Sequence, residues 1–339
     1  MAKPDLQTPN SHLPILIAGP TAVGKSQITL HLAEQLGGEI ISTDSMQVYG
    51  GLDIGTAKPS SAERARVPHH LIDICDLTES FDAAQFARLA LRAVAEIQSR
   101  GHVPILCGGT GLYFKAFLEG LGEAPPADAK LRAELEATQL EKLLDELRER
   151  DPATFEKIDQ KNPRRVIRAV EVIRLTGKPF SAQQSRWSKT PAEPVVGSSR
   201  RDDRTARHAV PSKTDFFCFT RPPADLHARI NARVDAMFVR GLVDETRELL
   251  KRGLAENKTA MQAIGYLQVV EHLRGERSLK ETIELVKIRT RQFAKRQLTW
   301  FRAQKNVEWI ELKPGEALEA VVEKLAYKEL DLDDENFGL

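Results

Sequence analysis

The sequence predicts an α/β fold in which a parallel sheet with crossover helices is interrupted by an all-helical domain. Short apolar runs such as "LPILIA" (13–18) alternate with helical patterns up to residue 124. Strands that alternate with helices form parallel sheets, because each crossover connection is long enough to hold a helix. From 125 to 190 the strand signals stop and charged helical patterns take over. A chain of 339 residues has room for both parts.

Composition excludes several classes of protein. The chain has 49 basic and 48 acidic residues, so a nucleic-acid-binding surface would need local clusters of charge. Its three cysteines are far apart and form no Cys-x-x-Cys pair, which argues against a zinc module and a disulfide framework. The polar N-terminus lacks the apolar stretch of a signal peptide, and no run is long enough to span a membrane. We therefore expect a cytoplasmic protein that does not bind membranes.

The first part of the core is expected over 13–124, after a disordered tail at 1–12. Four β-type runs predict strands, at 13–18, 38–45, 67–76 and 102–111. Helical patterns follow the first and the third run, and Gly37 with Gly38 is a typical helix end. Because the carboxyl ends of parallel strands meet at one edge, we expect any site to lie there.

The second half of the chain completes this arrangement. Within the helical insertion at 125–190, Asn162 and Pro163 predict a helix start with an N-cap and a first-turn proline. The segment 191–214 has Pro, Ser and mixed charge without periodicity and predicts a flexible loop. The core then continues over 215–312, with a returning strand, basic C-terminal helices and a last strand. An acidic tail is expected over 313–339.

The segment "GPTAVGKS" is the strongest chemical motif. A strand precedes it and a helix follows, which is the context of a phosphate-binding loop (P-loop) and predicts a core like that of P-loop NTPases. Its glycines let backbone N–H groups point into the loop, the lysine reaches the terminal phosphates, and the serine hydroxyl can bind Mg²⁺. The predicted phosphate-binding residues are Gly19, Pro20, Thr21, Ala22, Val23, Gly24, Lys25 and Ser26.

Three further features leave alternatives open. Asp44 follows the second strand and could be a base, a metal ligand or a helix cap. Lys58, in "GTAKP", could contact a phosphate or lie in a solvated loop. The strand at 102–111 ends in Gly-Gly-Thr rather than in the acidic Mg²⁺ ligand of many NTPases, and Asp73 and Asp76 are unconvincing substitutes. This pattern weakens an NTPase assignment and is compatible with a diphosphate that is not part of ATP.

Two basic clusters lie on predicted helices. One follows Asn162, and the other, "KIRTRQFAKRQLTWFRAQK", includes Trp300 and Phe301. Basic side chains beside aromatic rings fit single-stranded RNA loops, whose bases can stack on the rings. The alternative for each cluster is a solvated face with salt bridges.

Taken together, these segments resemble one family. "GPTAVGKS", "ISTDSMQVYGGLDIGTAKP", "VPHHLIDI", "GGTGLYFKAFLEGL", "NPRRVIRAVEV", "QAIGY" and "RTRQFAKRQLTWFR" occur in this order. From about 13 to 312 the chain resembles the bacterial tRNA dimethylallyltransferases, also called tRNA isopentenyltransferases. It differs from the family pattern in an extra loop near 195–212, and it has no C-terminal zinc finger of the kind found in eukaryotic members.

The resemblance implies transfer of a dimethylallyl group from dimethylallyl diphosphate to N6 of the adenosine at tRNA position 37, next to the anticodon. It implies that Asp44 is the general base and that the P-loop holds the diphosphate, with Thr21 and Arg229 in contact with it and Arg233 a weaker candidate. Ser26 would hold Mg²⁺, the expected cofactor. We expect a monomer whose partners are the donor and a tRNA anticodon stem-loop.

The resemblance also implies a tRNA-binding surface, to which the helical insertion contributes. Because a base inside the anticodon stack is inaccessible, the enzyme should extrude it into a pocket. Thr110 would contact the target nucleotide. The full implied set is Asp44, Ser45, Met46, Gln47, Thr110, Arg132, Arg164, Arg165, Val166, Ile167, Arg168, Gln262, Ala263, Ile264, Gly265 and Tyr266.

Three alternatives remain on the sequence alone. A small-molecule P-loop kinase is the natural interpretation of "GPTAVGKS" by itself, and it predicts ATP consumption without RNA. An adenylate prenyltransferase would use a free nucleotide as acceptor, which leaves the helical insertion and the basic clusters without a role. An RNA-binding regulator with a decayed site is disfavoured by intact Lys25, Ser26 and Asp44.

Overall fold

The computed structural model describes residues 13–120, 124–183, 214–304 and 306–329. The chain divides into two compact units, one of residues 1–117 with 211–339 and one of residues 118–210. The predicted tail at 1–12 and almost all of the predicted loop at 191–214 lie outside the described residues. No described helix is both long and apolar enough to cross a membrane.

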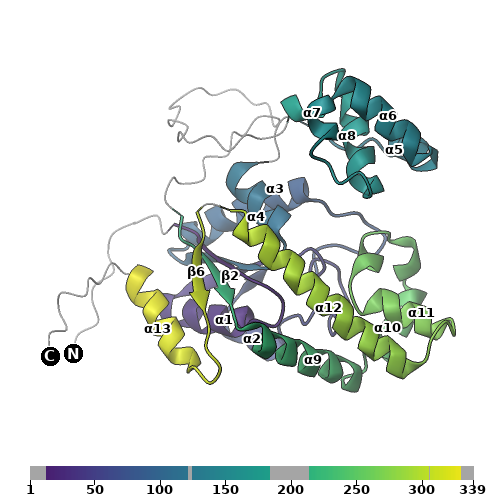
Figure 1. Ribbon diagram of the computed structural model, residues 1–339. Helices are drawn as coiled ribbons and strands as arrows, with labels where there is room; N and C mark the ends of the chain where they lie inside the picture. The colour runs from purple at the N-terminus through teal and green to yellow at the C-terminus, as the bar shows by residue number, and fades with distance from the viewer. Residues whose placement is uncertain (1–12, 121–123, 184–213, 305, 330–339) are drawn as a thin grey trace, which may run out of the picture. The chain divides into compact units, whose positions relative to one another are not determined.

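The larger unit is built on a six-stranded sheet in the order β3-β2-β4-β1-β5-β6 (Figure 1). All neighbouring strands pair in parallel, as predicted. The strands are β1 (Ile15–Ala18), β2 (Gly38–Thr43), β3 (His69–His70), β4 (Val103–Gly108), β5 (Phe216–Thr220) and β6 (Glu308–Glu311). β1 is central and fully buried, which explains why its sequence is apolar without alternation.

Helices pack on both faces of this sheet. The helices of the unit are α1 (Lys25–Leu36), α2 (Ser61–Arg66), α3 (Ala83–Ser99), α4 (Gly111–Glu119), α9 (Pro223–Val239), α10 (Leu242–Lys251), α11 (Tyr266–Leu273), α12 (Leu279–Arg302) and α13 (Leu318–Glu329). Ile15 and Ile17 of β1 pack in one core cluster with residues of α1, α9, α12 and α13. On β5 the ring of Phe216 instead contacts Phe114 of α4 and Phe301 of α12.

The segment expected as a tail contains a packed helix. In α13, Val321, Val322, Leu325 and Ala326 are buried in the cluster that also holds α1. Their spacing makes one apolar stripe on a helix that is otherwise charged. The expectation of a tail over this range is therefore wrong for α13, because the acidic residues around this stripe mask its helical periodicity.

The described part of the smaller unit contains helices and no strand, as expected for the insertion. Its helices are α5 (Ala129–Ala137), α6 (Leu140–Arg150), α7 (Pro152–Phe155), α8 (Pro163–Thr176) and the short η1 (Phe180–Ala182). Leucines of α5 and α6 and the apolar face of α8 form its core. The Asn162 side chain accepts a hydrogen bond from Arg165 N and Pro163 occupies the first turn, so the predicted start of α8 is confirmed.

Candidate active site

The P-loop joins the carboxyl end of β1 to the first turn of α1. Gly19 and Gly24 have φ values of 145° and 116°, which side chains rarely allow. A Cβ on Gly19 would also lie 2.7 Å from Phe219 O, so this glycine permits close packing on β5. Lys25 Nζ donates to Gly19 O at 2.9 Å and to Pro20 O at 2.8 Å. The loop therefore curls around its own lysine at the N-terminus of α1, where an anion is favoured.

Burial changes the electrostatics of this lysine. Desolvation lowers the pKa of Lys25 to about 8, and the nearby positive charge of Arg233 acts in the same direction. A diphosphate bound beside the ammonium would favour its charged form and offset that desolvation. The loop thus has the features of an anion site, and its lysine loses its proton at a lower pH than an exposed lysine does.

Arginines surround the outer side of the loop. Arg221 Nε donates to Val23 O at 2.7 Å, and Arg229 Nε donates to Ala22 O at 2.9 Å. Burial and the neighbouring Arg221 lower the pKa of Arg229. A cavity of about 360 Å³ lies here, lined by Ala22, Gly24, Lys25, Ser26, Gln27, Arg229, Ala232 and Arg233. Sequence reasoning missed Arg221, although it follows β5 closely, just as the P-loop follows β1.

A second cavity, of about 400 Å³, adjoins the inner side of the loop and shares Lys25, Ser26 and Arg233 with the first. It is lined in addition by residues that follow β2 and β4, and by α9, α12 and the chain before α11. The predicted site residues on its wall are Thr21, Lys25, Ser26, Asp44, Ser45, Met46, Gln47, Thr110, Gln262, Ala263 and Ile264. The structure thus brings the phosphate loop and the loop of Asp44 to one cavity, which we call the central cavity.

Asp44 has one of the roles left open by its sequence, that of a cap. Its Oδ1 accepts hydrogen bonds from Met46 N at 2.8 Å and Gln47 N at 3.4 Å, so it caps the turn that follows β2. Within the described residues it forms no ion pair, and it borders the central cavity. The capping bonds fix the carboxylate in place, while its second oxygen stays free to accept a proton.

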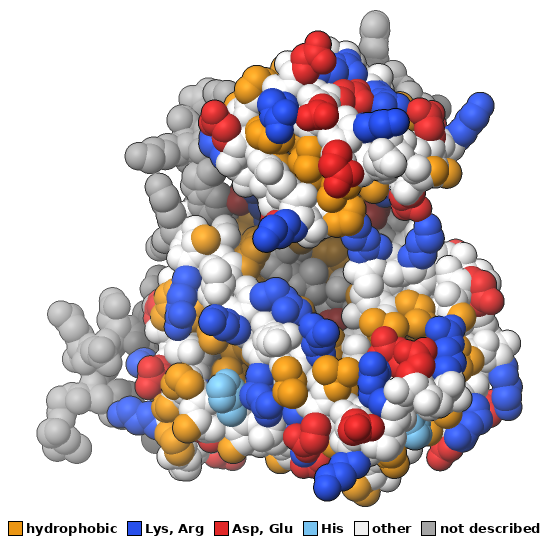
Figure 2. Space-filling model, turned by 45° about the vertical axis from the view of Figure 1, so that its right-hand side comes forward, with side chains coloured by type: hydrophobic (Ala, Val, Ile, Leu, Met, Phe, Trp, Pro, Cys, Tyr) orange, Lys and Arg blue, Asp and Glu red, His pale blue; other side chains and the backbone are white. Residues whose placement is uncertain are grey.

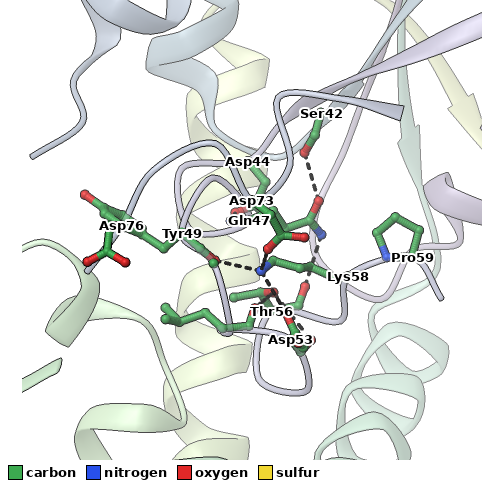
Figure 3. A network of polar contacts seen from close by, with 12 residues as sticks. Ser42, Asp44, Gln47, Tyr49, Asp53, Thr56, Lys58, Pro59, Asp73 and Asp76 are labelled. Atoms are coloured by element: carbon green, nitrogen blue, oxygen red, sulfur yellow. Dashed lines mark hydrogen bonds and ion pairs between the residues drawn. The ribbon is translucent and has the colours of Figure 1, made fainter. Parts of the chain in front are cut away.

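The loop after Asp44 is held from two sides (Figure 3). Gln47 Oε1 accepts from Ser42 Oγ at 2.8 Å, and its Nε2 donates to Thr56 O at 3.2 Å. Arg233 also donates to Thr56 O, at 3.5 Å. The Gln47 side chain therefore connects the Asp44 turn to the segment around Thr56.

Lys58 neither contacts the P-loop nor lies in a solvated loop. Its side chain is 2% exposed, and Nζ donates to Tyr49 O at 2.7 Å, to Asp53 Oδ1 at 2.8 Å and to Asp73 (Figure 3). Asp73 also pairs with Arg64. This lysine clamps the loop internally, and the charge of Asp73 is committed to the two cations.

The glycines of "GGTG" serve close packing. A Cβ on Gly108 would lie 2.1 Å from Thr43 O, and one on Gly111 would lie 2.3 Å from the ring of Trp300. The closely packed loop brings the hydroxyl of Thr110 to Ser45 N, from which it accepts a hydrogen bond at 3.1 Å. Thr110 therefore lies directly beside the Asp44 turn.

Tyr266 and Gly265, which the resemblance assigned to the tRNA surface, are buried instead. Tyr266 OH donates to Glu245 Oε1 at 2.6 Å and accepts from Gly55 N at 3.0 Å. Its ring fills space that a Cβ on Gly55 would occupy. Tyr266 thus supports the loop that carries Lys58 and cannot contact RNA with its side chain.

Two of the residues assigned to tRNA in the smaller unit are also core residues. Val166 and Ile167 are 0% and 9% exposed and pack with the leucines of α5 and α6. Arg132 and Arg168 both donate to Glu171, which is fully buried. The sequence did not reveal this carboxylate, because nothing local distinguishes it from a surface glutamate.

The remaining pair in this unit, Arg164 and Arg165, is exposed in the first turn of α8. Both residues are solvent-exposed, and the guanidinium groups of Arg132 and Arg168 are directed to Glu171.

The basic cluster on α12 is only partly a free surface. Lys287 pairs with Asp235 and Glu284, so the alternative of a salt-bridged face holds for this residue, whereas Arg291 donates to the neutral amide of Asn231. Charges of both signs are mixed across the face seen in Figure 2.

The aromatic residues of this cluster lie differently from the sequence expectation. Phe301 is fully buried against Phe114 and cannot stack on a base. Phe293, which is 36% exposed, lines the central cavity together with Arg296. The sequence did not show which face of α12 is covered, and that face decides the role of each ring.

The residues present fit a Mg²⁺ ion that arrives with a diphosphate. The Ser26 hydroxyl borders both cavities, and Asp44 borders the central one. Among the described residues, no group of three or more His, Cys, Asp or Glu side chains could hold a metal ion by itself. Mg²⁺ commonly takes one or two protein ligands and completes its shell with phosphate oxygens and water.

Comparisons with known proteins identify the family of this chain. The family model described as IPP transferase matches residues 47–304. The chain is 46% identical over 317 residues to a tRNA dimethylallyltransferase of Halorhodospira halophila, covering 91% of this chain and 96% of that one. It is 45% identical over 300 residues to tRNA dimethylallyltransferase 1 of Trichlorobacter lovleyi, covering 87% and 92%.

Solved structures that match this chain include enzymes of the same kind. A tRNA isopentenylpyrophosphate transferase of Bacillus halodurans matches with a TM-score of 0.65 at 38% identity, covering 94% of this chain and 97% of that one. A eukaryotic dimethylallyltransferase solved while acting on tRNA matches with a TM-score of 0.72 at 27% identity, covering 93% and 78%. With the family model matching most of its length, this chain belongs to the IPP transferase family.

Proposed function

We propose that this protein transfers the dimethylallyl group of dimethylallyl diphosphate to N6 of the adenosine at tRNA position 37, giving N6-(dimethylallyl)adenosine. The observation that carries the proposal is the central cavity, which is lined both by the phosphate-binding Lys25 and Ser26 and by the carboxylate of Asp44. Membership of the IPP transferase family supports it. We expect the enzyme to act as a monomer in the cytoplasm.

The P-loop side of the cavity suits the leaving group. In the transfer, the bond between C1 of the donor and its diphosphate oxygen breaks, and the diphosphate gathers negative charge. Backbone amides of the loop and the Lys25 ammonium would stabilise that charge, and the guanidinium of Arg229, which lines the neighbouring cavity, would do so from the outer side of the loop. Mg²⁺ held by Ser26 would supply further charge neutralisation to the diphosphate when bound.

The Asp44 side of the cavity suits the nucleophile. The N6 amine is weakly nucleophilic because its lone pair is delocalised into the ring. As its bond to C1 forms, it must lose a proton, which passes to the Asp44 carboxylate. General-base assistance of this kind is typically worth about 10²–10⁴ in rate. Thr110, which touches the Asp44 turn, is placed to contact the same nucleotide.

The acceptor must be extruded from the anticodon loop to reach this cavity. On the larger unit, Gln262 and Ile264 border the cavity and are proposed RNA contacts. On the smaller unit we retain the exposed Arg164 and Arg165 as phosphate contacts. Arg132 and Arg168 are proposed to shape that surface through Glu171 rather than to bind phosphates directly.

The alternatives account for less of the structure. A P-loop kinase would need an acidic Mg²⁺ ligand after β4, where this chain has glycines that pack on Thr43 and Trp300. An adenylate prenyltransferase would not need the helical unit. The curated relatives, which are named tRNA dimethylallyltransferases, favour a tRNA acceptor over both alternatives.

A transfer assay tests the proposal. Purified protein with Mg²⁺ and radiolabelled dimethylallyl diphosphate is given an unmodified anticodon stem-loop, a matched stem-loop with guanosine at position 37, or AMP. We expect label only in the adenosine-37 RNA, without ATP. Label in AMP but not in RNA would support the adenylate prenyltransferase. ATP hydrolysis with no label in any acceptor would support the kinase and refute the proposal.

A further inference from the structure

The side chain of Gln297 connects two loops of the central cavity. It projects from α12 and is 6% exposed. Its Oε1 accepts a hydrogen bond from Thr21 N at 2.9 Å, and its Nε2 donates to Gly109 O at 2.9 Å. Thr21 lies in the P-loop, whereas Gly109 follows β4. One buried amide therefore satisfies a main-chain donor and a main-chain acceptor from different loops.

The orientation of this amide is fixed by its partners. The Thr21 N–H can only donate and the Gly109 carbonyl can only accept, so the side-chain oxygen must face the P-loop. The absence of a side chain at residue 109 makes room for the amide, because a Cβ there would lie 2.1 Å from Gln297 Nε2. Gln297 and Gly109 thus fit each other as a pair.

The contact removes one donor from the phosphate loop. In a P-loop the inward backbone amides are the donors that cradle phosphate oxygens. Here the Thr21 amide already donates to an uncharged side-chain oxygen. While this bond is made, the Thr21 amide is not available to a phosphate oxygen. The loop therefore offers one donor fewer than it would without Gln297.

The contact also links the two halves of the reaction. Gly109 precedes Thr110, whose hydroxyl accepts from Ser45 N beside Asp44. A displacement of Gln297 would therefore change the separation between the diphosphate loop and the loop of the general base. Misplacing reacting groups by about 1 Å can cost about 10² in rate.

We propose that Gln297 is a positioning and specificity-determining residue. It makes the P-loop prefer a diphosphate over a triphosphate, and it fixes the position of the P-loop relative to the Asp44–Thr110 side of the cavity. The inference rests on the proposed function for its positioning part. The selectivity part concerns binding alone and stands on the contacts of Gln297.

Three variants test the proposal. Gln297→Met removes both hydrogen bonds at similar side-chain length. Gln297→Glu keeps an acceptor for Thr21 N, cannot donate to Gly109 O, and brings a negative charge to the loop. Gln304→Met is the matched control, because Gln304 follows the same helix and bonds only Trp300 O, away from both cavities. Thermal unfolding of each variant establishes which of them fold.

Binding of pyrophosphate and of tripolyphosphate, each with Mg²⁺, is measured by calorimetry. For Gln297→Met we expect the preference for pyrophosphate over tripolyphosphate to fall by about tenfold, since the Thr21 amide becomes a phosphate donor. For Gln297→Glu we expect both anions to bind about tenfold or more weakly. An unchanged preference for pyrophosphate in Gln297→Met, or unchanged binding of both anions in Gln297→Glu, would overturn the selectivity role. If Gln297→Met does not fold, Gln297→Glu still decides the test.

Transfer kinetics test the positioning role. In both Gln297 variants we expect kcat to fall by about tenfold or more, with the KM for the stem-loop within about twofold of the wild type. Kinetics equal to those of Gln304→Met would overturn this role. If the wild type transfers no label, the proposed function fails, whereas the calorimetric preference still decides the selectivity role independently.

Discussion

Replacing Lys58 by methionine should destabilise the larger unit and so weaken the support of Asp44. The ammonium is almost completely buried and donates to Tyr49 O, Asp53 and Asp73. Removing one partner of a buried ion pair costs about 3–5 kcal/mol. The carboxylate side chains of Asp53 and Asp73 are 57% and 34% exposed, so water replaces part of the lost interaction. We therefore expect a loss of about 2 kcal/mol.

The same clamp predicts a pH dependence. Burial alone would raise the pKa of Asp73, but hydrogen bonds from Lys58 and Arg64 outweigh it and lower the pKa below the ordinary value of 3.8. A carboxyl group whose pKa is lowered by folding stabilises the native state above its unfolded pKa, and this contribution is lost as pH falls. The stability difference between wild type and Lys58→Met should therefore narrow below about pH 4.

Urea denaturation at neutral pH and near pH 3, below the ordinary pKa of Asp73, measures both effects. A loss of about 2 kcal/mol corresponds to a melting temperature lower by about 4–8 °C in a unit of this size. Lys251→Met is the matched control, because that lysine forms an exposed pair with Glu248 and should change stability by less than about 0.5 kcal/mol. A Lys58 variant as stable as the Lys251 variant, or a difference that does not depend on pH, would refute the reasoning.

Three further predictions concern other parts of the site. Asp44→Asn keeps the oxygen that caps the turn but loses the base. We therefore expect kcat to fall about 10²–10⁴-fold, while stem-loop binding measured by filter retention is unchanged. Equal losses in kcat and in stem-loop binding would contradict the role of Asp44 as the base. Because the pKa of Lys25 is about 8, kcat/KM for the donor should decline above about pH 8, as the ammonium loses its proton. A pH profile of kcat/KM that stays flat to about pH 9 would show that the charge of Lys25 is not needed. Glu171→Gln should weaken the hydrogen bonds that anchor Arg132 and Arg168. We therefore expect faster hydrogen exchange in α8 and a higher KM for the stem-loop, with the KM for the donor unchanged. Unchanged exchange in α8 would contradict the anchor role.

The sequence predicted the parts of the site that depend on topology. β1, the P-loop and α1 lie where the motif placed them, and β2 and β4 flank the expected edge of the sheet. Because parallel strands end at one edge, Asp44 and Thr110 could be expected beside Lys25 without any knowledge of side-chain contacts. These expectations needed only the order of strands and helices and the chemistry of the loops between them.

The parts that the sequence did not predict depend on partners distant in the chain. Gln297 contacts a P-loop residue 276 positions away. Lys58 and Tyr266 both look like polar residues of exposed loops, and each is buried by a packing arrangement that no local pattern specifies. The same reason explains Phe301: its helix was predictable, but the face of α12 that is covered depends on α4 and β5. Whether a side chain binds RNA or supports a loop is thus decided by tertiary contacts.

A phosphate-binding fold suits carbon transfer for a physical reason. In phosphoryl transfer and in prenyl transfer alike, negative charge grows on phosphate oxygens, and P-loop amides with a lysine stabilise that charge equally well. The two reactions differ in the group that attacks and in the residues that contact this group. Here the loops after β2 and β4 present a carboxylate and a hydroxyl to the cavity, where a proton acceptor and a nucleotide contact are needed. Gln297 bonds both the P-loop and the loop after β4, so in the proposed reaction it connects the loop that holds the anion with a loop that faces the acceptor.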